Sequence, residues 1–524
     1  MYTPSLSSAA SMLLLLSTST SYFAQAAVIP SHFAEVQHGT TSATSPTATL
    51  LACLKPLGSK VLTSSSPNYN QERYGFDLRY NYLPQVIVMA TTVPDVQTAT
   101  KCATDSGVAI APRSGGHSFE GYSIGGENGS MVIDLTGFNH VSVSASGVAK
   151  VGAGMRLGPL YLELFKQGGW TLNAGTCPSV GVGGHTLGGG FGLLGRKHGL
   201  LIDSIVEIQF INAQGELLIA DANNNKDLFY ALRGAGGGSY GVVTQFTYQA
   251  VKPSSTVTSY TYDWDLKDYK GVLRAYVDFQ VNASRDVGVE MNVGPDGLEM
   301  YGLFEGTKAQ QAEAMKGFLS KAPKPKRSDV RVGRHIDAQL RFSYIAGNPT
   351  NIEALSLTGK YKPGDSRYTK GKSLVYPEPL KDSTIELLGK WGAITPKGST
   401  ANYIIVDIWG GAVSDVSADA TAFIHRNAHS VFEFVAEWNE DPNAKPGIPD
   451  CKDCLAWMKN MYAEFLDDFK ANYGPVRGYQ NYIDKELTNW EDAYYGDAFS
   501  RLKQIKKAVD PGNTFRFPQS IPLP

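Results

Sequence analysis

Between residues 80 and 250, short apolar runs alternate with amphipathic stretches, and each change of pattern predicts a new element. Strands are predicted where β-branched residues dominate, at Val86–Ala90, Val108–Ala111, Met131–Leu135, Ile205–Ile211 and Glu216–Ala220. Pro94 and Asp95 open a predicted helix that runs to Ser106, and Pro159 stands where another helix would begin. This mixture of elements predicts an α+β lobe whose glycine clusters lie in its connections.

A different pattern begins near residue 253. Apolar and polar residues alternate over Val287–Val293 and Leu298–Phe304, as in an antiparallel sheet with one exposed face. Asn402–Trp409 is a further predicted strand, and helical periodicity covers Lys308–Lys321 and Ala456–Tyr473. We therefore expect a second lobe of longer strands and amphipathic helices.

The length of 524 residues exceeds what one compact core usually contains, so two domains are expected. The predicted divisions are 1–26, 27–79, 80–252, 253–475 and 476–524. Residues 1–26 are interpreted as a signal peptide, because an apolar run precedes the A-x-A site Ala24-Gln25-Ala26. No Lys or Arg precedes that run, so a poorly ordered tail is the alternative.

The net charge of -2 gives no electrostatic basis for binding nucleic acid or an anionic membrane. No later segment approaches the roughly 20 apolar residues that a membrane span requires. Together with the predicted signal peptide, these observations lead us to expect a soluble, secreted protein. We also expect it to be a monomer.

Secretion changes the interpretation of the five cysteines, since an oxidising compartment favours disulfides and an odd number leaves one thiol over. Cys53 and Cys102 lie in or beside predicted helices, and Cys451 and Cys454 form a C-x-x-C. If these make two bridges, Cys177 remains unpaired. A zinc site is the alternative for the C-x-x-C, because His425 and His429 precede it with ligand-like spacing.

Three glycine-rich segments carry the candidate chemistry. Arg113–Ser118 (RSGGHS) follows a predicted strand, and its small residues leave backbone N–H groups free to face an anion. Residues 175–192 contain many glycines around Cys177. Ordering these glycines costs chain entropy, which a loop that binds a ligand tightly would justify. A free thiol in such a loop would be nucleophilic. Residues 236–241 match G-x-G-x-x-G, but a helix precedes them and a strand follows, the reverse of a nicotinamide-binding motif.

Taken together, these segments resemble the flavin domain of the vanillyl-alcohol-oxidase superfamily, in its berberine-bridge-enzyme-like branch. The C-terminal residues also resemble that branch, through Tyr479-Gln-Asn-Tyr482-Ile-Asp484, Trp490, Tyr494-Tyr-Gly, Asp510-Pro and Pro518-Gln-Ser-Ile521. The likeness covers nearly the whole chain after the signal peptide and is nearest to the fungal oligosaccharide oxidases. It implies a two-domain α+β fold, with a PCMH-type FAD-binding domain, to which residues 476–524 return, and an α/β substrate domain with a large antiparallel sheet.

The resemblance also implies site residues. His117 would bond the 8α-methyl of FAD and Cys177 its C6, which accounts for the unpaired cysteine. Val180 matches the position that admits oxygen, where valine is typical of oxidases. Tyr482 matches the catalytic base and Asp407 its activating partner, although a core tyrosine is the alternative for Tyr482. The further predicted cofactor-binding residues are Arg113, Ser114, Gly115, Gly116, Ser118, Gly181, Gly184, His185, Gly188, Val243 and Asn481.

The activity so implied is oxidation of the anomeric hydroxyl of reducing-end oligosaccharides to lactones, with molecular oxygen reduced to hydrogen peroxide. Phe119 departs from the pattern, because related sugar oxidases have Tyr there, and this leaves the substrate open. The alternatives are an oxidase of a secondary metabolite on the same fold, and a flavin-binding surface protein without catalysis. Asn128 and Asn282 begin glycosylation sequons, while Pro349 excludes Asn348.

Overall fold

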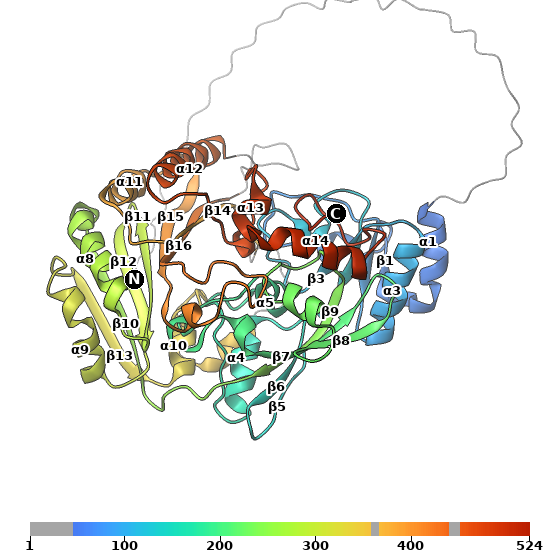
Figure 1. Cartoon of the computed structure of the whole chain (residues 1–524), viewed down its shortest axis with the longest axis horizontal. Helices are drawn as coiled ribbons and strands as arrows, with labels where there is room; N and C mark the ends of the chain where they lie inside the picture. Colours follow the sequence, from blue (N-terminus) through green and yellow to red (C-terminus); the bar gives the residue numbers. More distant parts are fainter. Residues whose placement is uncertain (1–45, 358–365, 440–450) are drawn as a thin grey trace, which may run out of the picture. The chain divides into compact units, whose positions relative to one another are not determined.

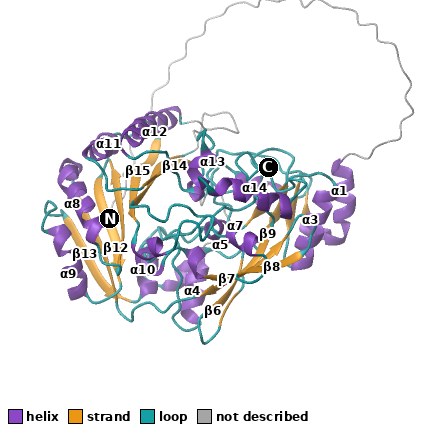
Figure 2. Cartoon of the chain, viewed as in Figure 1, coloured by secondary structure: helices purple, strands orange, loops and turns teal. Residues whose placement is uncertain are grey.

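A computed structural model describes residues 46–357, 366–439 and 451–524 (Figure 1). The predicted signal peptide and residues 27–45 lie outside the described residues. Helices and strands fall close to the positions that the sequence predicts, in three separate sheets (Figure 2).

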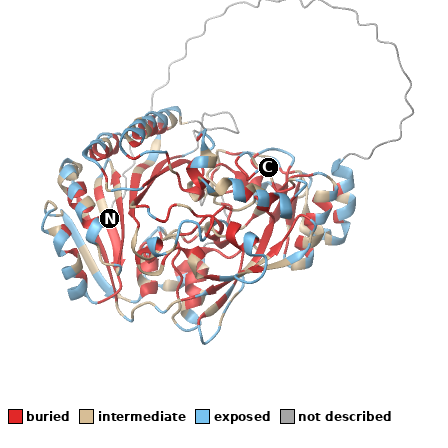
Figure 3. Cartoon of the chain, viewed as in Figure 1, coloured by how far each residue is buried: buried red, intermediate tan, exposed pale blue. Residues whose placement is uncertain are grey.

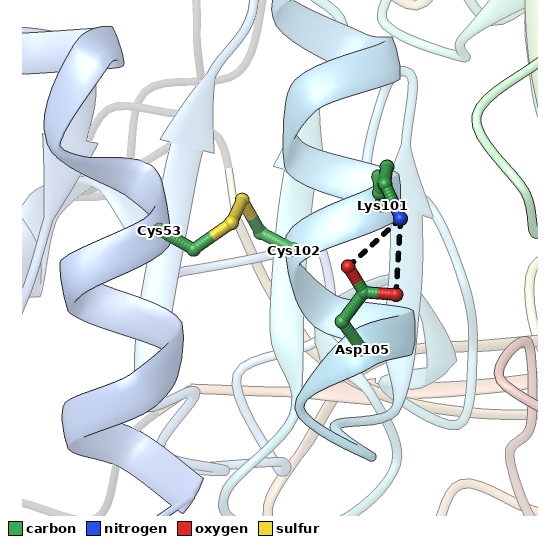
Figure 4. Close-up of a disulfide and its surroundings, with 4 residues drawn as sticks. All are labelled: Cys53, Lys101, Cys102 and Asp105. Atoms are coloured by element: carbon green, nitrogen blue, oxygen red, sulfur yellow. Dashed lines mark hydrogen bonds and ion pairs between the residues drawn. A yellow bond between two sulfur atoms is a disulfide. The ribbon is translucent and has the colours of Figure 1, made fainter.

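The first sheet has four strands in the order β1-β2-β4-β3, and β4 is parallel to both of its neighbours. Its strands are β1 (Val61–Leu62), β2 (Val86–Met89), β3 (Ile110–Arg113) and β4 (Met131–Asp134). The helix α3 (Val93–Asp105) begins at a capping box in which Thr92 and Asp95 satisfy each other's backbone N–H groups. A disulfide between Cys53 and Cys102 joins α3 to α1 (Pro46–Leu54) (Figure 4).

The second sheet is antiparallel, with the order β5-β6-β9-β7-β8. Its strands are β5 (Val141–Val143), β6 (Val148–Gly152), β7 (Ile205–Ile211), β8 (Leu217–Asp221) and β9 (Val242–Gln249). The helices of this region are α4 (Leu157–Lys166), α5 (Val182–Leu187), α6 (Gly195–His198) and α7 (Lys226–Ala231). The predicted hairpin is thus the pair β7–β8, while the glycine-rich residues lie between the elements.

The third sheet is a seven-stranded antiparallel sheet in the order β13-β10-β12-β11-β15-β16-β14. Its strands are β10 (Val257–Trp264), β11 (Val287–Gly294), β12 (Gly297–Phe304), β13 (Arg327–Gly333), β14 (Tyr368–Tyr376), β15 (Ser399–Ile408) and β16 (Ser430–Trp438). The helices that follow its strands are α8 (Tyr269–Asn282), α9 (Lys308–Leu319), α10 (His335–Arg341), α11 (Asp382–Gly392) and α12 (Lys452–Asn472).

The expectation of a sheet with one solvent-exposed face was wrong. Helices α8, α9, α11 and α12 flank the sheet, and their outer sides are exposed (Figure 3). The strands β11, β14 and β16 are nevertheless buried along nearly their whole length, so the other face is covered as well. The polar residues that alternate along β11 therefore point into the interior, where Glu290 is only 8% exposed.

After α12 the chain returns to the first two sheets through α13 (Trp490–Tyr495) and α14 (Ala498–Val509). Ile110 at the start of β3 donates a backbone hydrogen bond to Thr514, and the Tyr240 hydroxyl donates one to the Leu502 carbonyl. The predicted two-domain α+β fold with a large antiparallel sheet is confirmed. The boundaries at residues 79, 252 and 475 stay predictions.

Cys451 and Cys454 form the second disulfide, so neither sulfur is available as a thiolate ligand, and the zinc alternative was wrong. Within the described ranges, no helix combines the length and the apolar character that crossing a membrane requires. Asn128 and Asn282, the predicted glycosylation sites, are both exposed.

Candidate active site

A cavity of about 720 Å³ is lined by the predicted attachment residues, His117 and Cys177, and by the predicted catalytic residues, Tyr482 and Asp407. Its walls are the loop 114–119, residues 175–181 and the C-terminal segment 479–483, and side chains of β11, β14, β15 and β16 complete it. A volume of this size falls within the range of cofactor and ligand sites.

The first two loops touch backbone to backbone. A Cβ atom on Gly115 would lie 2.3 Å from the Gly181 nitrogen, so only glycine fits at this contact. The Ser114 hydroxyl donates to the Ala153 carbonyl at 2.6 Å and accepts from the Gly183 N–H at 3.1 Å. These contacts hold the two loops against each other.

His117 and Cys177, from different loops, share one neighbour. The Ser179 hydroxyl lies 2.7 Å from His117 Nε2 and 3.4 Å from Cys177 Sγ. Cys177 is the one cysteine outside the two disulfides. Burial, with the charges of Arg156 and Arg367, holds the pKa of His117 well below its usual range, so its imidazole is neutral and able to act as a nucleophile.

His185 also lines the cavity, and its Nε2 accepts a hydrogen bond from the Gly175 N–H at 3.1 Å. Burial lowers the pKa of His185 to about 4, so this ring is neutral as well. Asn481 donates to the His185 carbonyl at 2.9 Å, which joins the C-terminal segment to this loop.

Tyr482 faces a group of three carboxylic acids on the seven-stranded sheet. Glu290 on β11 is the direct register partner of Asp407 on β15, and Glu433 on β16 pairs with Ile405, diagonal to Asp407. Glu433 and Asp407 both act on the Tyr482 hydroxyl through their charges, and Glu433 has the larger effect. The predicted partner Asp407 is thus present, and Glu433 is a second acid that influences the phenol.

Burial dominates the electrostatics of this group. Burial and then the charge of Glu290 raise the pKa of Glu433 to about 8, and burial raises that of Glu290 to about 7. Burial, together with Glu290 and Glu433, raises the pKa of Asp407 well above its usual range. Burial and then the Glu433 and Asp407 charges raise the pKa of Tyr482 well above 10, so a resting phenolate is disfavoured.

Aromatic rings enclose Tyr482 and extend to the cavity mouth. Tyr479 lies edge-on to it at 5.1 Å between ring centroids, and Phe119 and Phe191 lie at 6.2 Å. Tyr344 lines the cavity but is 59% exposed, and its φ of +56° is unusual for a side chain of this size. Its hydroxyl is 3.4 Å from Glu290 Oε1, so the ring is held at the opening.

Three of the predicted cofactor residues do not line the cavity. Arg113 is buried and donates from Nε to Asp134 at 2.7 Å, and Val243 is buried within β9. Gly188 lies beneath Asn481, where a Cβ would meet the amide oxygen at 2.0 Å. These residues shape the cavity from behind it. The other predicted positions, Ser114, Gly115, Gly116, Ser118, Val180, Gly181, Gly184 and Asn481, do line it.

Sequence reasoning missed Ser179, Glu290 and Glu433. Ser179 lies inside a motif whose neighbours had been singled out. The two acids carry a weaker signal, which is a single Glu within an otherwise apolar strand, as in Phe432-Glu433-Phe434. Such a residue is expensive to bury and is a candidate for function.

Comparison with known proteins agrees with this arrangement. The family model described as "FAD binding domain" matches residues 84–221, and the model "Berberine and berberine like" matches residues 478–522. The structure of BBE-like 1 from Physcomitrella patens superposes with a TM-score of 0.82 at 36% identity, covering 91% of this chain and 99% of that one. The chain belongs to the berberine-bridge-enzyme-like family.

Within this family, a curated relative is the chitooligosaccharide oxidase of Gibberella zeae, 29% identical over 90% of this chain and 94% of its own. A solved glucooligosaccharide oxidase from Acremonium strictum, described with a 6-S-cysteinyl, 8α-N1-histidyl FAD, has a TM-score of 0.80 at 27% identity, with 90% and 99% coverage. This berberine-bridge-enzyme-like protein is an FAD-linked oxidoreductase, and the predicted cofactor is confirmed.

The residues present fit an FAD. The cavity wall is glycine-rich, and a Cβ on Gly184 would meet nothing within 4 Å, so the backbone there is open to a ligand. The two nucleophiles His117 and Cys177 line the same cavity as the three carboxylic acids.

Proposed function

We propose that the protein is a secreted oxidase that converts the anomeric hydroxyl of a reducing-end oligosaccharide into a lactone and reduces molecular oxygen to hydrogen peroxide. The observation that carries this proposal is the shared cavity of Tyr482, its acidic partners, His117 and Cys177. The similar oligosaccharide oxidases support the substrate class.

His117 and Cys177 hold FAD through two covalent bonds in this proposal. When bound, FAD would supply the two-electron chemistry by which the sugar carbon is oxidised and molecular oxygen is reduced. Ser179 contacts both attachment residues and so orients the imidazole and the thiol together. Two bonds secure the cofactor without enclosing it, which leaves an open side for a long substrate.

Tyr482 removes the hydroxyl proton. Because its own pKa is raised, the phenol must pass its proton on as it takes one from the sugar, and Glu433 is the acid that acts on it most strongly. Glu290 strengthens Glu433 as a base, since its negative charge raises the proton affinity of that carboxylate. The pair Tyr482–Glu433 therefore acts as one base.

Recognition of the sugar follows from the remaining lining. Glu290 and Asp407 offer carboxyl oxygens to sugar hydroxyls, and the exposed Tyr344 ring offers a flat apolar face to a second sugar unit at the mouth. The unusual backbone of Tyr344 is consistent with a position kept for binding rather than for packing.

Residues 80–252 with 476–524 are proposed as the FAD domain and 253–475 as the substrate domain, with the cavity between their loops and strands. Secretion is supported by the two disulfides, which persist in oxidising compartments. Exposure of Asn128 and Asn282 supports glycosylation at both.

A second candidate is an oxidase of an aromatic or alkaloid alcohol on the same fold. The observation that favours it is the apolar wall of Phe76, Phe119 and Phe191, since Phe119 brings no hydroxyl to the substrate. A larger share of ring surface suits a flat, apolar substrate better than a sugar.

Peroxide release separates the two candidates. The purified protein is assayed with cello-, xylo- and chito-oligosaccharides and with a panel of aromatic and alkaloid alcohols, beside Tyr482→Phe as the matched blank. Tyr482-dependent peroxide from the oligosaccharides supports the proposal. Release only from the aromatic or alkaloid panel overturns it in favour of the second candidate, and no release from either panel argues against catalysis.

A further inference from the structure

A cluster of five charged residues, four of them buried, lies beside the active site, and the chemistry described above does not use it. The Lys370 cluster consists of Lys370 and Lys372 on β14, Glu120 in the loop after His117, and Asp484 and Glu486 after Tyr482. Lys370 Nζ lies 2.6 Å from Glu120 Oε1 and 2.6 Å from Asp484 Oδ1. All three of these side chains are 3% exposed or less.

Stability alone gives a poor reason for such a cluster. Removing two cations and two anions from water is costly, and replacing buried ion pairs by apolar residues is often neutral or stabilising. Burial works to lower the pKa of Lys370, but Glu120, Asp484 and Glu486 together raise it above its usual value. The ammonium stays charged and binds two segments at once.

Each segment held by Lys370 carries an active-site residue within three positions. Glu120 follows His117 by three residues, and Asp484 follows Tyr482 by two. Thr369, the neighbour of Lys370 on β14, itself lines the cavity. One ammonium therefore joins the FAD-attachment loop, the base and the seven-stranded sheet.

Side-chain packing beside the ion pairs also connects the loop after His117 to β14. Phe119 covers Gly371, where a Cβ would come within 3.0 Å of its ring, and Gly371 separates the two lysines on β14. The same ring faces Tyr482 at 6.2 Å. A shift of residues 117–121 would move both Phe119 and His117 relative to Tyr482.

The two anchored segments differ in how firmly other contacts hold them. Asp484 also accepts from Lys372 at 2.6 Å, its N–H is bonded to the Tyr494 hydroxyl, and its carbonyl accepts from Gln519 at 2.8 Å. Glu120 contacts Lys370 and the Tyr80 hydroxyl through its side chain. Ser114, Gly115 and Gly116 are fixed by other contacts, so loss of Lys370 would free residues 117–121 more than the segment that carries Tyr482.

We propose that Lys370 is a positioning residue that fixes the His117 loop relative to Tyr482, and thereby sets the distance between the attached FAD and the base. This inference rests on the proposed roles of His117 and Tyr482. Misplacement of reacting groups by about 1 Å can cost roughly 100-fold in rate, so a residue without contact to substrate can still control turnover.

Attachment of FAD tests the loop without any substrate. In the Cys177→Ala background, where only His117 can hold FAD, Lys370→Met should lower the covalently labelled fraction several-fold. In the His117→Ala background, Lys370→Met should leave attachment through Cys177 nearly unchanged. Lys370→Arg should restore His117 labelling in part, because it returns the positive charge. Equal labelling with and without Lys370→Met in the Cys177→Ala background would overturn the proposal.

The rate of flavin reduction tests whether Lys370 sets the distance between the attached FAD and Tyr482. With the best substrate of the panel, Lys370→Met should lower the rate of flavin reduction roughly 10- to 100-fold, leave KM within a few-fold and keep the pH profile of the wild type. The matched control is Arg426→Met, which breaks the buried Arg426–Asp203 pair away from the cavity and should lower Tm without changing the rate. An equal rate loss in both variants would assign Lys370 to stability instead.

Tyr482→Phe, measured in parallel, separates failure of this inference from failure of the proposed function. If Tyr482→Phe keeps the wild-type rate, the proposed base is wrong. If Tyr482→Phe is impaired while Lys370→Met is not, only the positioning role is wrong.

Discussion

Glu433 and Tyr482 line the same cavity and perturb each other's ionisation, and burial and Glu290 raise the pKa of the Glu433 carboxyl to about 8. A carboxyl that accepts a proton must be ionised, so the Tyr482–Glu433 pair works as a base only in that form. The relation between these two residues therefore gives the enzyme a pH dependence that neither residue would have alone.

The rate of flavin reduction by substrate should rise between pH 6 and pH 9 with a midpoint near the Glu433 pKa of about 8. Glu433→Gln should be slower and should lose this rise, because an amide does not ionise. Glu378→Gln is the matched control, since Glu378 lies outside the cavity lining, is paired with Lys381 at 3.1 Å and should leave the midpoint in place. Stopped-flow absorbance of the flavin gives the rates.

The stability of the folded protein should also depend on the ionisation of Glu433, but it should fall with rising pH where the rate rises. The folded pKa of Glu433 lies above its ordinary 4.5, so its contribution to stability is full below pH 4.5 and is lost as the pH rises through about 8. Tm of the wild type should therefore fall more steeply from pH 5 to pH 8 than Tm of Glu433→Gln. Parallel slopes in thermal unfolding would contradict the assignment.

Tyr482→Phe removes the proposed base without creating space. Loss of a positioned base typically costs roughly 10²–10⁴-fold, so flavin reduction should slow by about that factor while the absorbance spectrum and covalent FAD stay normal. The double variant Tyr482→Phe/Glu433→Gln should be much less than multiplicatively worse, because the two residues act as a unit. A rate within a few-fold of the wild type would remove Tyr482 from the mechanism.

FAD should remain bound after acid precipitation, and each of His117→Ala and Cys177→Ala should retain it through the other bond. Only the double variant should release its yellow colour. Ser179→Ala should slow attachment at both residues, since its hydroxyl contacts both. Peptide mass mapping of the flavin-labelled fragments distinguishes the two links, and release of all colour from the wild type would show that neither link forms.

Val180 should allow rapid reoxidation by air. It lines the cavity, and its backbone is held by hydrogen bonds to Leu157 and Cys177, so a larger side chain must extend into the space. Val180→Ile should slow reoxidation roughly tenfold, a barrier increase of about 1.4 kcal/mol, and leave reduction by substrate nearly unchanged. Stopped-flow mixing of reduced enzyme with oxygen measures this; slow reoxidation of the wild type would indicate an acceptor other than oxygen.

Local patterns predicted most of the fold. The β-branched runs at β2, β4 and β7 and the capping residues before α3 specify their elements through nearest-neighbour chemistry. The glycine loops could also be predicted as a ligand site. Ordering so many glycines costs chain entropy, and a ligand or a close contact must offset that cost.

Pairing between distant strands could not be predicted in the same way. Glu290 and Glu433 meet Tyr482 only because β11, β15 and β16 are neighbours in one particular register, and a shift of one residue would turn each acid to the other face. The same applies to Lys370, which resembles any polar residue in a strand until Glu120 and Asp484 are placed beside it. Arg113 was predicted to bind the cofactor because its motif does, yet its partner is Asp134.

The contact of Gly115 with Gly181 has a practical consequence. Because a methyl group on either glycine would collide with the backbone of the other loop, neither position accepts a side chain. Gly115→Ala or Gly181→Ala should therefore separate the two loops and impair FAD attachment at His117 and Cys177 together. The same glycines would be the two positions that a directed-evolution library should leave untouched.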